Sequence, residues 1–285
     1  MTQLITSTSQ LRTECDAARA RGQVVGLVPT MGFLHDGHRS LMRIARSECD
    51  FVVVTIFVNP MQFGPNEDLD RYPRDLDGDV AACVAERVDF VFAPSVGEMY
   101  PRGPSATVVH VDGLTDRLCG ASRPGHFDGV TTVVAKLFAI AGPCRAYFGR
   151  KDAQQLAVVA RMAADLDVPV VVVGCPIVRE RDGLALSSRN AYLSPEHRAI
   201  APTLQRALGE AETAFESGQR DANQLVAIVR EAISGHPAID LDYVECVDAE
   251  SLEPMEAIDR PVLVALAARI GATRLIDNVV LTPTP

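Results

Sequence analysis

The sequence lacks any long apolar run. Of its 285 residues, 47% are hydrophobic and 22% are charged, which is an ordinary globular composition. The longest apolar runs, such as residues 168–173, have the length of a strand and fall well short of the roughly 18–20 residues that span a membrane. Residues 1–10 show neither the basic nor the apolar region of a secretory signal. We therefore expect a cytoplasmic protein without a membrane partner.

Paired cysteines and an excess of positive charge are also missing. The seven cysteines are widely spaced and never form a Cys-x-x-Cys pair, which argues against a disulfide framework or a zinc site and for a reducing compartment. Lysine and arginine together number 27 against 37 acidic residues, so the net charge is −10. Such a chain is a poor general binder of nucleic acid. An anionic ligand must therefore be held by a local cluster of basic groups.

Apolar strands alternate with helices over the first 176 residues. Residues 24–28 and 51–58 are almost wholly apolar, which is typical of parallel strands buried on both faces. Further strands are expected at residues 88–93, 145–149 and 170–173, and helices at residues 8–21, 40–48, 76–87, 130–141 and 153–164. This alternation predicts that residues 1–176 form a doubly wound, Rossmann-like α/β domain with a parallel sheet.

The pattern changes after residue 176. Ser194 and Pro195 form an N-cap and first helical position, so one helix is expected at residues 195–216. A second helix is expected at residues 221–233 because its apolar residues recur at helical spacing. Three β-like segments follow at residues 241–247, 261–268 and 274–281. We expect residues 177–285 to form a smaller α+β lid domain with an antiparallel sheet.

A strand-to-helix turn with two histidines is the most informative stretch of the chain. His35 and His38 flank Gly37 directly after the apolar strand, and an apolar helix follows them. The N-terminus of a helix offers unpaired N–H groups and a positive dipole end, which favour phosphate. Two histidines at this spacing are by themselves more often surface or capping residues. Their place after a buried strand favours a functional site.

Polar residues also gather after the other predicted strands. Taken singly, each is ordinary turn or surface chemistry. In a doubly wound sheet, however, the carboxyl ends of the strands border one crevice, where ligands bind. We therefore expect one cleft with basic, amide and hydroxyl groups. Its candidate residues are Thr30, Met31, His35, His38, Asn59, Pro60, Met61, Gln62, Gly149, Arg150, Lys151, Asp152, Gln155, Arg181, Asp182, Ser187, Ser188, Arg189 and Asn190.

The same segments resemble a known family over essentially the full length of the chain. They are similar to the motifs of the pantothenate synthetase (pantoate–β-alanine ligase) family, a branch of the nucleotidylyltransferase-like superfamily. The His-x-Gly-His turn alone would indicate only the superfamily, whereas residues 55–64 and 182–190 are specific to the family. The matching segments are residues 29–38, 55–64, 68–74, 123–130, 151–156 and 182–190.

The resemblance implies an activity and a set of roles. It implies an ATP-dependent condensation of D-pantoate with β-alanine through a pantoyl adenylate, carried out by a homodimer with Mg²⁺. The implied catalytic groups are His35, His38 and Lys151. The implied ATP-binding residues are Pro29, Thr30, Met31, His35, His38, Gly149, Lys151, Asp152, Val178, Ser187, Ser188 and Arg189. The implied pantoate and β-alanine contacts are Met31, Asn59, Gln62 and Gln155, and Asp79 is the carboxylate expected near a magnesium ion held mainly by phosphates.

Two other functions remain as alternatives. Another enzyme of the superfamily would stop after transferring a nucleotidyl group, and product analysis would separate it from a ligase. Against it stand the two glutamines, Gln62 and Gln155, and the second domain. A nucleotide-binding regulator without activity would be favoured by the loss of a phosphate-binding residue, and the motifs keep them all.

Overall fold

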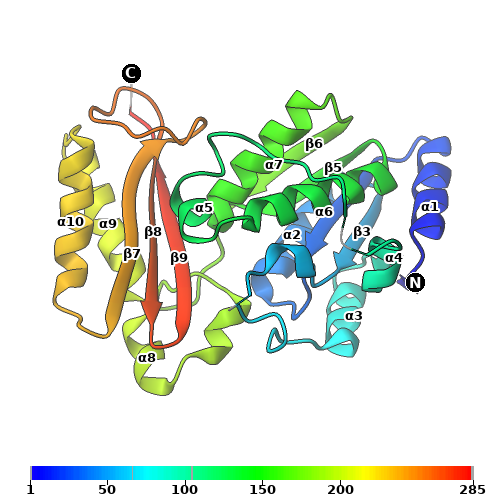
Figure 1. The fold of residues 1–285 in the computed structure, drawn as a ribbon, viewed down its shortest axis with the longest axis horizontal. Helices are drawn as coiled ribbons and strands as arrows, with labels where there is room; N and C mark the ends of the chain where they lie inside the picture. Colours follow the sequence, from blue (N-terminus) through cyan, green and yellow to red (C-terminus); the bar gives the residue numbers. More distant parts are fainter. Residues whose placement is uncertain (1, 66, 104, 284–285) are drawn as a thin grey trace.

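The first part of the chain forms a six-stranded parallel sheet, and a three-stranded antiparallel sheet follows it (Figure 1). The computed structural model describes residues 2–65, 67–103 and 105–283. The first sheet has the order β1-β4-β3-β2-β5-β6 and the second the order β7-β8-β9. The strands are β1 (Gln3–Ile5), β2 (Val25–Thr30), β3 (Phe51–Ile56), β4 (Phe90–Phe92), β5 (Cys144–Gly149), β6 (Val170–Cys175), β7 (Ile239–Asp248), β8 (Val262–Ile270) and β9 (Thr273–Leu281).

Helices lie between most of the strands. The α-helices are α1 (Thr8–Ala20), α2 (Asp36–Glu48), α3 (Leu76–Ala85), α4 (Val96–Met99), α5 (Leu118–Ser122), α6 (His126–Ala141), α7 (Ala153–Asp165), α8 (Pro195–Ile200), α9 (Thr203–Glu216) and α10 (Ala222–Ser234). Three short 3₁₀ turns follow strand ends or loops: η1 (Pro60–Gln62), η2 (Arg150–Asp152) and η3 (Ser188–Tyr192).

The central strands are buried on both faces, as their apolar sequences predict. Leu27 of β2 belongs to the apolar cluster that contains residues of α1 and α6. Its neighbour Val28 belongs to the cluster that contains Leu41 and Met42 of α2. Successive side chains of a strand point to opposite faces, so helices cover both sides of this sheet. The expected doubly wound, Rossmann-like fold is confirmed.

The strand order reverses between β2 and β5. From β2 the chain builds outward through β3 and β4, and it then returns to add β5 and β6 on the other side of β2. In such sheets the crevice for ligands lies at this switch point, beyond the carboxyl ends of the two strands. The histidine turn follows β2 and η2 follows β5, so both border the switch point.

The second sheet packs on both of its faces. Its Val264 and Leu266 pack with residues of α9 and α10. Leu263 and Ala265 of β8 instead belong to the large cluster that also contains residues of α6. Figure 1 shows α9 and α10 on the far side of this sheet from the six-stranded one. Apolar packing thus crosses residue 176, and the domain boundary there stays a prediction.

Two expectations about elements need correction. The single helix expected at residues 195–216 is wrong, because α8 ends at Ile200 and α9 begins at Thr203. Pro202 lies between them, and a proline inside a helix lacks the N–H and clashes with the preceding turn. Strand β1 was not expected, because it is only three residues long and mixes polar and apolar residues. Its pairing with β4 places Gln3 beside Phe90, a contact that only the fold supplies.

Candidate functional site

The two histidines cap helix α2 and each other. The Nδ1 atom of His35 accepts a hydrogen bond from the backbone N–H of Gly37 at 3.1 Å. The Nδ1 atom of His38 accepts one from the backbone N–H of His35 at 3.3 Å. A ring whose Nδ1 accepts carries its proton on Nε2 when neutral. Both histidines therefore keep an Nε2–H group as a donor, with their ring centroids 4.1 Å apart.

Both histidines stay neutral at physiological pH. Burial lowers the pKa of His35 to about 4, and the nearby charge of Lys151 contributes to the shift. Burial also lowers the pKa of His38 to about 3, together with His35 and Lys151. Neutral rings keep their Nδ1 atoms available for the capping bonds. They can donate to an anion through Nε2 without a change of protonation.

Asp79 stabilises the turn that leads from β2 to the histidines. Its carboxylate accepts the backbone N–H groups of Phe33 at 2.8 Å and Leu34 at 2.6 Å. Gly32 has φ 82°, and a Cβ there would lie 2.8 Å from the Asp79 carboxylate. Asp79 is 3% exposed and is absent from the described cavity walls. These contacts give Asp79 a structural role in the turn, and its expected place near magnesium stays a prediction.

Gln62 reaches the cavity while Asn59 positions it. The Nδ2 of Asn59 donates to the Gln62 side-chain oxygen at 3.2 Å and to the Gly129 carbonyl at 2.9 Å. The Asn59 oxygen accepts from the Tyr100 hydroxyl at 2.8 Å. Asn59 is 1% exposed, so its polar atoms are used within the fold. Asn59 thus orients Gln62, whose Nε2 lies 3.0 Å from the Met31 sulfur, and its expected contact with substrate stays a prediction.

Of the residues after β5, Lys151 and Gln155 line the cavity at the switch point, whereas Gln154 does not. Lys151 is partly buried and its Nζ lies 3.8 Å from the Asp152 carboxylate. Gln154 points away from the switch point and accepts from the Cys119 N–H at 2.9 Å. Its Nε2 donates to two carbonyls of the 114–117 segment, each at 2.8 Å. Gln155 lines the cavities, and its side chain has no hydrogen bond to other described residues.

The 187–189 loop closes the opposite side of the cavity. Ser187 caps the η3 turn by accepting the backbone N–H of Arg189 at 3.2 Å. The Ser188 hydroxyl donates to the Phe33 carbonyl at 3.3 Å, which ties the loop to the histidine turn. Arg189 pairs with both oxygens of Asp68, at 3.0 and 3.2 Å. The pair uses Nε and Nη2 of Arg189, so an anionic ligand can bind Nη1 or replace Asp68.

These residues line a cavity of about 220 Å³ at the switch point, here called the motif cavity. Apart from Asn59 and Asp79, each site residue that the resemblance implies lies in its wall. Of the residues expected only from their position after the strands, the wall lacks Pro60, Met61, Arg150, Arg181, Asp182 and Asn190. The wall contains Pro29, Thr30, Met31, His35, His38, Gln62, Gly149, Lys151, Asp152, Gln155, Val178, Ser187, Ser188 and Arg189. Residues from four separate segments thus meet in one place, as their positions after the strands predict.

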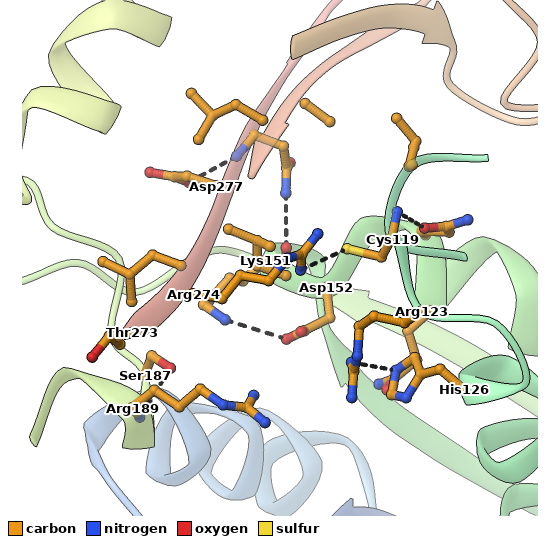
Figure 2. Close-up of a pocket in the computed structure, with 18 of the residues that line it drawn as sticks. Cys119, Arg123, His126, Lys151, Asp152, Ser187, Arg189, Thr273, Arg274 and Asp277 are labelled. Atoms are coloured by element: carbon orange, nitrogen blue, oxygen red, sulfur yellow. Dashed lines mark hydrogen bonds and ion pairs between the residues drawn. The ribbon is translucent and has the colours of Figure 1, made fainter. Parts of the chain in front are cut away.

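A second cavity of about 490 Å³ lies between the first part of the chain and the second sheet, and we call it the sheet cavity (Figure 2). Its wall shares Lys151, Asp152, Gln155, Ser187 and Arg189 with the motif cavity. Sequence reasoning missed the rest of its polar wall, which includes Arg123, His126, Arg269, Thr273, Arg274, Asp277 and Asn278. Residues 123–130 were a motif of the resemblance, and that was the available signal for Arg123 and His126.

Strand β9 holds the η2 turn in place. Asn278 donates through Nδ2 to the carbonyls of Arg150 at 3.0 Å and Lys151 at 2.9 Å. Asp277 accepts from Arg179 at 2.6 and 2.9 Å. The second sheet therefore holds the backbone of Lys151 in place. No sequence pattern near residue 278 indicates this contact.

The fold and the site define an α/β protein whose switch-point cavity has the donors for an anionic ligand. The chain matches the Pantoate-beta-alanine ligase family over residues 3–280. The pantothenate synthetase of Acetivibrio thermocellus is 53% identical over 277 residues, which are 97% of this chain and 98% of the relative. That of Heliobacterium modesticaldum is 57% identical over 259 residues, which are 91% and 92%. The chain belongs to the pantoate-beta-alanine ligase family.

Solved structures agree with this assignment. The crystal structure of pantothenate synthetase from Thermus thermophilus superimposes with a TM-score of 0.93 at 48% identity, covering 99% of this chain and 100% of that one. The pantoate-beta-alanine ligase from Francisella tularensis, solved as a complex with Beta-gamma ATP and beta-alanine, gives 0.80 at 32% identity, covering 98% and 97%. Within the described residues, no helix has the length and apolar character needed to cross a membrane.

Proposed function

We propose that this chain joins D-pantoate to β-alanine in an ATP-dependent reaction with a pantoyl-adenylate intermediate. A pantoate carboxylate oxygen first attacks the α-phosphorus of ATP, and pyrophosphate leaves. The amine of β-alanine then attacks the acyl carbon, the bond from that carbon to the AMP oxygen breaks, and an amide forms. The ammonium group of β-alanine loses two protons to solvent in this step, and the amide nitrogen keeps the third. The motif cavity carries this proposal, because it combines donors for a triphosphate with two amides for a small hydroxy acid.

Phosphate chemistry of this kind depends on positioning and charge more than on a protein nucleophile. The Nε2–H groups of His35 and His38 are donors at the N-terminus of α2, where the helix dipole favours an anion. Lys151 adds a positive charge from the neighbouring strand. We assign these three groups to the charge that grows on the phosphate oxygens in the transition state.

The rest of the nucleotide follows from the cavity wall. Ser187, Ser188 and Arg189 would hold the outer phosphates, with the guanidinium exchanging Asp68 for phosphate oxygens. Asp152 and the Gly149 backbone would accept and position the ribose hydroxyls. The adenine would contact the chain at Val178. Pro29, Thr30 and Met31 would border the junction of ATP and pantoate.

The pantoate would lie between two glutamines and an apolar wall. An amide can donate to a carboxylate and accept from a hydroxyl, which suits Gln62 and Gln155 to a hydroxy acid. Val133, Val134 and Leu137 of α6 line the same cavity and suit the two methyl groups of pantoate. Asn59 acts through Gln62 by fixing its amide oxygen.

Magnesium fits this cavity as a companion of the nucleotide. The described residues contain no group of three or more His, Cys, Asp or Glu side chains that could hold a metal ion. Asp152 is the one carboxylate among the described residues of the motif cavity. Phosphate oxygens and water would therefore supply most ligands of Mg²⁺. When bound, the ion supplies positive charge to the phosphate oxygens that leave as pyrophosphate.

Assembly and location complete the proposal. We propose a homodimer, for which the edge strand β6 is a candidate contact because Val171 on it is 57% exposed. A reducing, cytoplasmic setting is supported by the cysteines. All seven are free and buried.

Product analysis tests the proposed reaction. Purified protein with ATP, D-pantoate and β-alanine should release AMP and pyrophosphate in equal amounts. Omission of pantoate should abolish the release of AMP. ADP as the nucleotide product would contradict the adenylate route, since it would show transfer of the terminal phosphoryl group instead.

A further inference from the structure

An ion pair between Glu67 and Arg123 stands in the wall of the sheet cavity. The guanidinium donates through Nε and Nη2 to the two carboxylate oxygens of Glu67, both at 2.6 Å. The side chains are 26% and 17% exposed, so the pair is partly shielded from water. Burial alone would raise the pKa of Glu67. The hydrogen bonds and charge of Arg123 outweigh this effect, so the pKa of Glu67 lies below its ordinary value. This forked geometry is the one that arginine offers to a carboxylate ligand.

His126 holds the guanidinium next to the predicted pantoate contact. Its Nδ1–H donates to the backbone carbonyl of Gln62 at 2.8 Å, and its Nε2 accepts from Nη1 of Arg123 at 2.9 Å. Burial and the Arg123 charge lower the pKa of His126 to about 4, so the ring is neutral at pH 7 and can accept. Figure 2 shows Arg123 and His126 side by side at the cavity wall. Arg123 also contacts the Gln62 carbonyl directly, at 3.4 Å.

Among the described residues, no other cation of the sheet cavity has a hydrogen bond to Gln62. Arg189 is assigned above to phosphate, and Lys151 lies at the switch point. Arg274 pairs with Asp242 at 2.7 and 3.0 Å and lies 3.4 Å from the Cys119 sulfur. Arg71 and Arg269 are exposed. Among the described residues, Arg123 is therefore the partly buried cation that touches the backbone of Gln62.

The chemistry of Glu67 indicates what else this arginine can bind. Beyond its Cα, a glutamate is –CH₂–CH₂–COO⁻, which is the carbon chain of β-alanine. We propose that Arg123 anchors the carboxylate of β-alanine, and that Glu67 occupies this anchor when the amine substrate is absent. The inference rests on the proposed function and adds a subsite to it. It assigns Arg123 a substrate contact and makes His126 a residue that positions it.

The subsite explains how the amine is aimed. With its carboxylate on Arg123, β-alanine extends its amino group toward the side chains of Gln62 and Gln155, between which the pantoyl carbonyl is proposed to lie. The C–N bond then forms as the bond to the AMP oxygen breaks, as in the proposed reaction. No further reactant is needed. Selection for an amine that carries a carboxylate follows from the same contact.

The test compares two half-reactions in the full-length protein. Adenylation is measured by pantoate-dependent exchange between ATP and pyrophosphate. The second step is measured by amide formation from β-alanine or from β-alaninamide, in which an uncharged amide replaces the carboxylate. Arg123→Gln should lower kcat/KM for β-alanine about 100-fold, as expected for a charged hydrogen-bonding partner that is lost. Its exchange rate should change less than about threefold. Arg123→Lys should recover part of the loss.

Selectivity separates anchoring from a purely structural role. The wild type should prefer β-alanine over β-alaninamide by about 100-fold or more, and Arg123→Gln should reduce this ratio to about fivefold or less. Glu67→Gln removes the competing charge and should lower the KM for β-alanine. Arg269→Gln, which removes an exposed cation of the same cavity, is the matched control and should keep the wild-type ratio.

The outcomes distinguish this inference from the proposed function. If wild-type protein shows no pantoate-dependent exchange, the proposed function fails. If exchange is present and Arg123→Gln keeps the wild-type preference for β-alanine over β-alaninamide, the anchor is wrong while the proposed function stands. A Glu67→Gln variant that raises the KM for pantoate and β-alanine alike would show that the pair only holds residues 67–72 in place.

Discussion

The two cavities differ in how the chain builds them. The motif cavity takes its polar residues from short stretches directly after β2, β3 and β5, together with one loop. The sheet cavity joins α5 and the start of α6 to strands β8 and β9, more than 130 residues further along the chain. A strand-to-turn motif is readable in sequence because its geometry is local. A wall made by two packed sheets and their helices depends on packing that no local pattern encodes.

The largest expected effect concerns the motif cavity. His35→Asn keeps an oxygen that can accept the Gly37 N–H, so helix α2 keeps its cap. It removes the Nε2–H donor, and adenylation should slow about 100-fold or more, as for other lost transition-state donors. Because the pKa of His35 is about 4, single-turnover assays at pH 7 to 8 measure the loss of a neutral donor. A wild-type rate in a folded variant would remove His35 from the chemistry.

A smaller effect is expected at Gln154 and Gln155, which are adjacent in the sequence but have different contacts. Gln155→Ala should raise the KM for pantoate about tenfold or more with an unchanged midpoint of unfolding, because the Gln155 side chain has no hydrogen bond to other described residues. Gln154→Ala should lower the free energy of unfolding by about 1–3 kcal/mol, because it leaves buried backbone groups of residues 114–119 unpaired.

Steady-state kinetics and urea unfolding of both variants check this contrast. We expect the loss of pantoate affinity in Gln155→Ala and the loss of stability in Gln154→Ala. Equal losses of pantoate affinity in both variants would show that position along α7 does not separate a substrate contact from a structural one.

Sequence reasoning reached most of the fold and most of the motif cavity, but it gave no sign of the contacts that Asp79 and Asn59 make within the chain. Strand and helix periodicity predicted the doubly wound sheet, and the turn after β2 predicted the histidine site. Asp79 and Asn59 have the right chemistry for ligands, yet their partners are the backbone of Phe33 and Leu34 and the carbonyl of Gly129. Those partners come from other elements, so their roles became visible only in the folded chain.

Arg123 is a second residue whose contacts could not be predicted from the sequence. Its motif was visible in the sequence, but its contacts with Glu67 and with the Gln62 carbonyl connect segments 56 and 61 residues apart. Residue type and spacing suggested a matching motif, while the role required the cavity.

The transfer of a carboxylate oxygen tests the central claim most directly. D-pantoate labelled with ¹⁸O in its carboxylate is incubated with ATP, β-alanine and the protein, and the products are analysed by mass spectrometry. If pantoate attacks the α-phosphorus and β-alanine then breaks the acyl C–O bond, AMP must carry one ¹⁸O atom and pyrophosphate none. Label in pyrophosphate or inorganic phosphate, or unlabelled AMP beside formed amide, would contradict the pantoyl-adenylate mechanism.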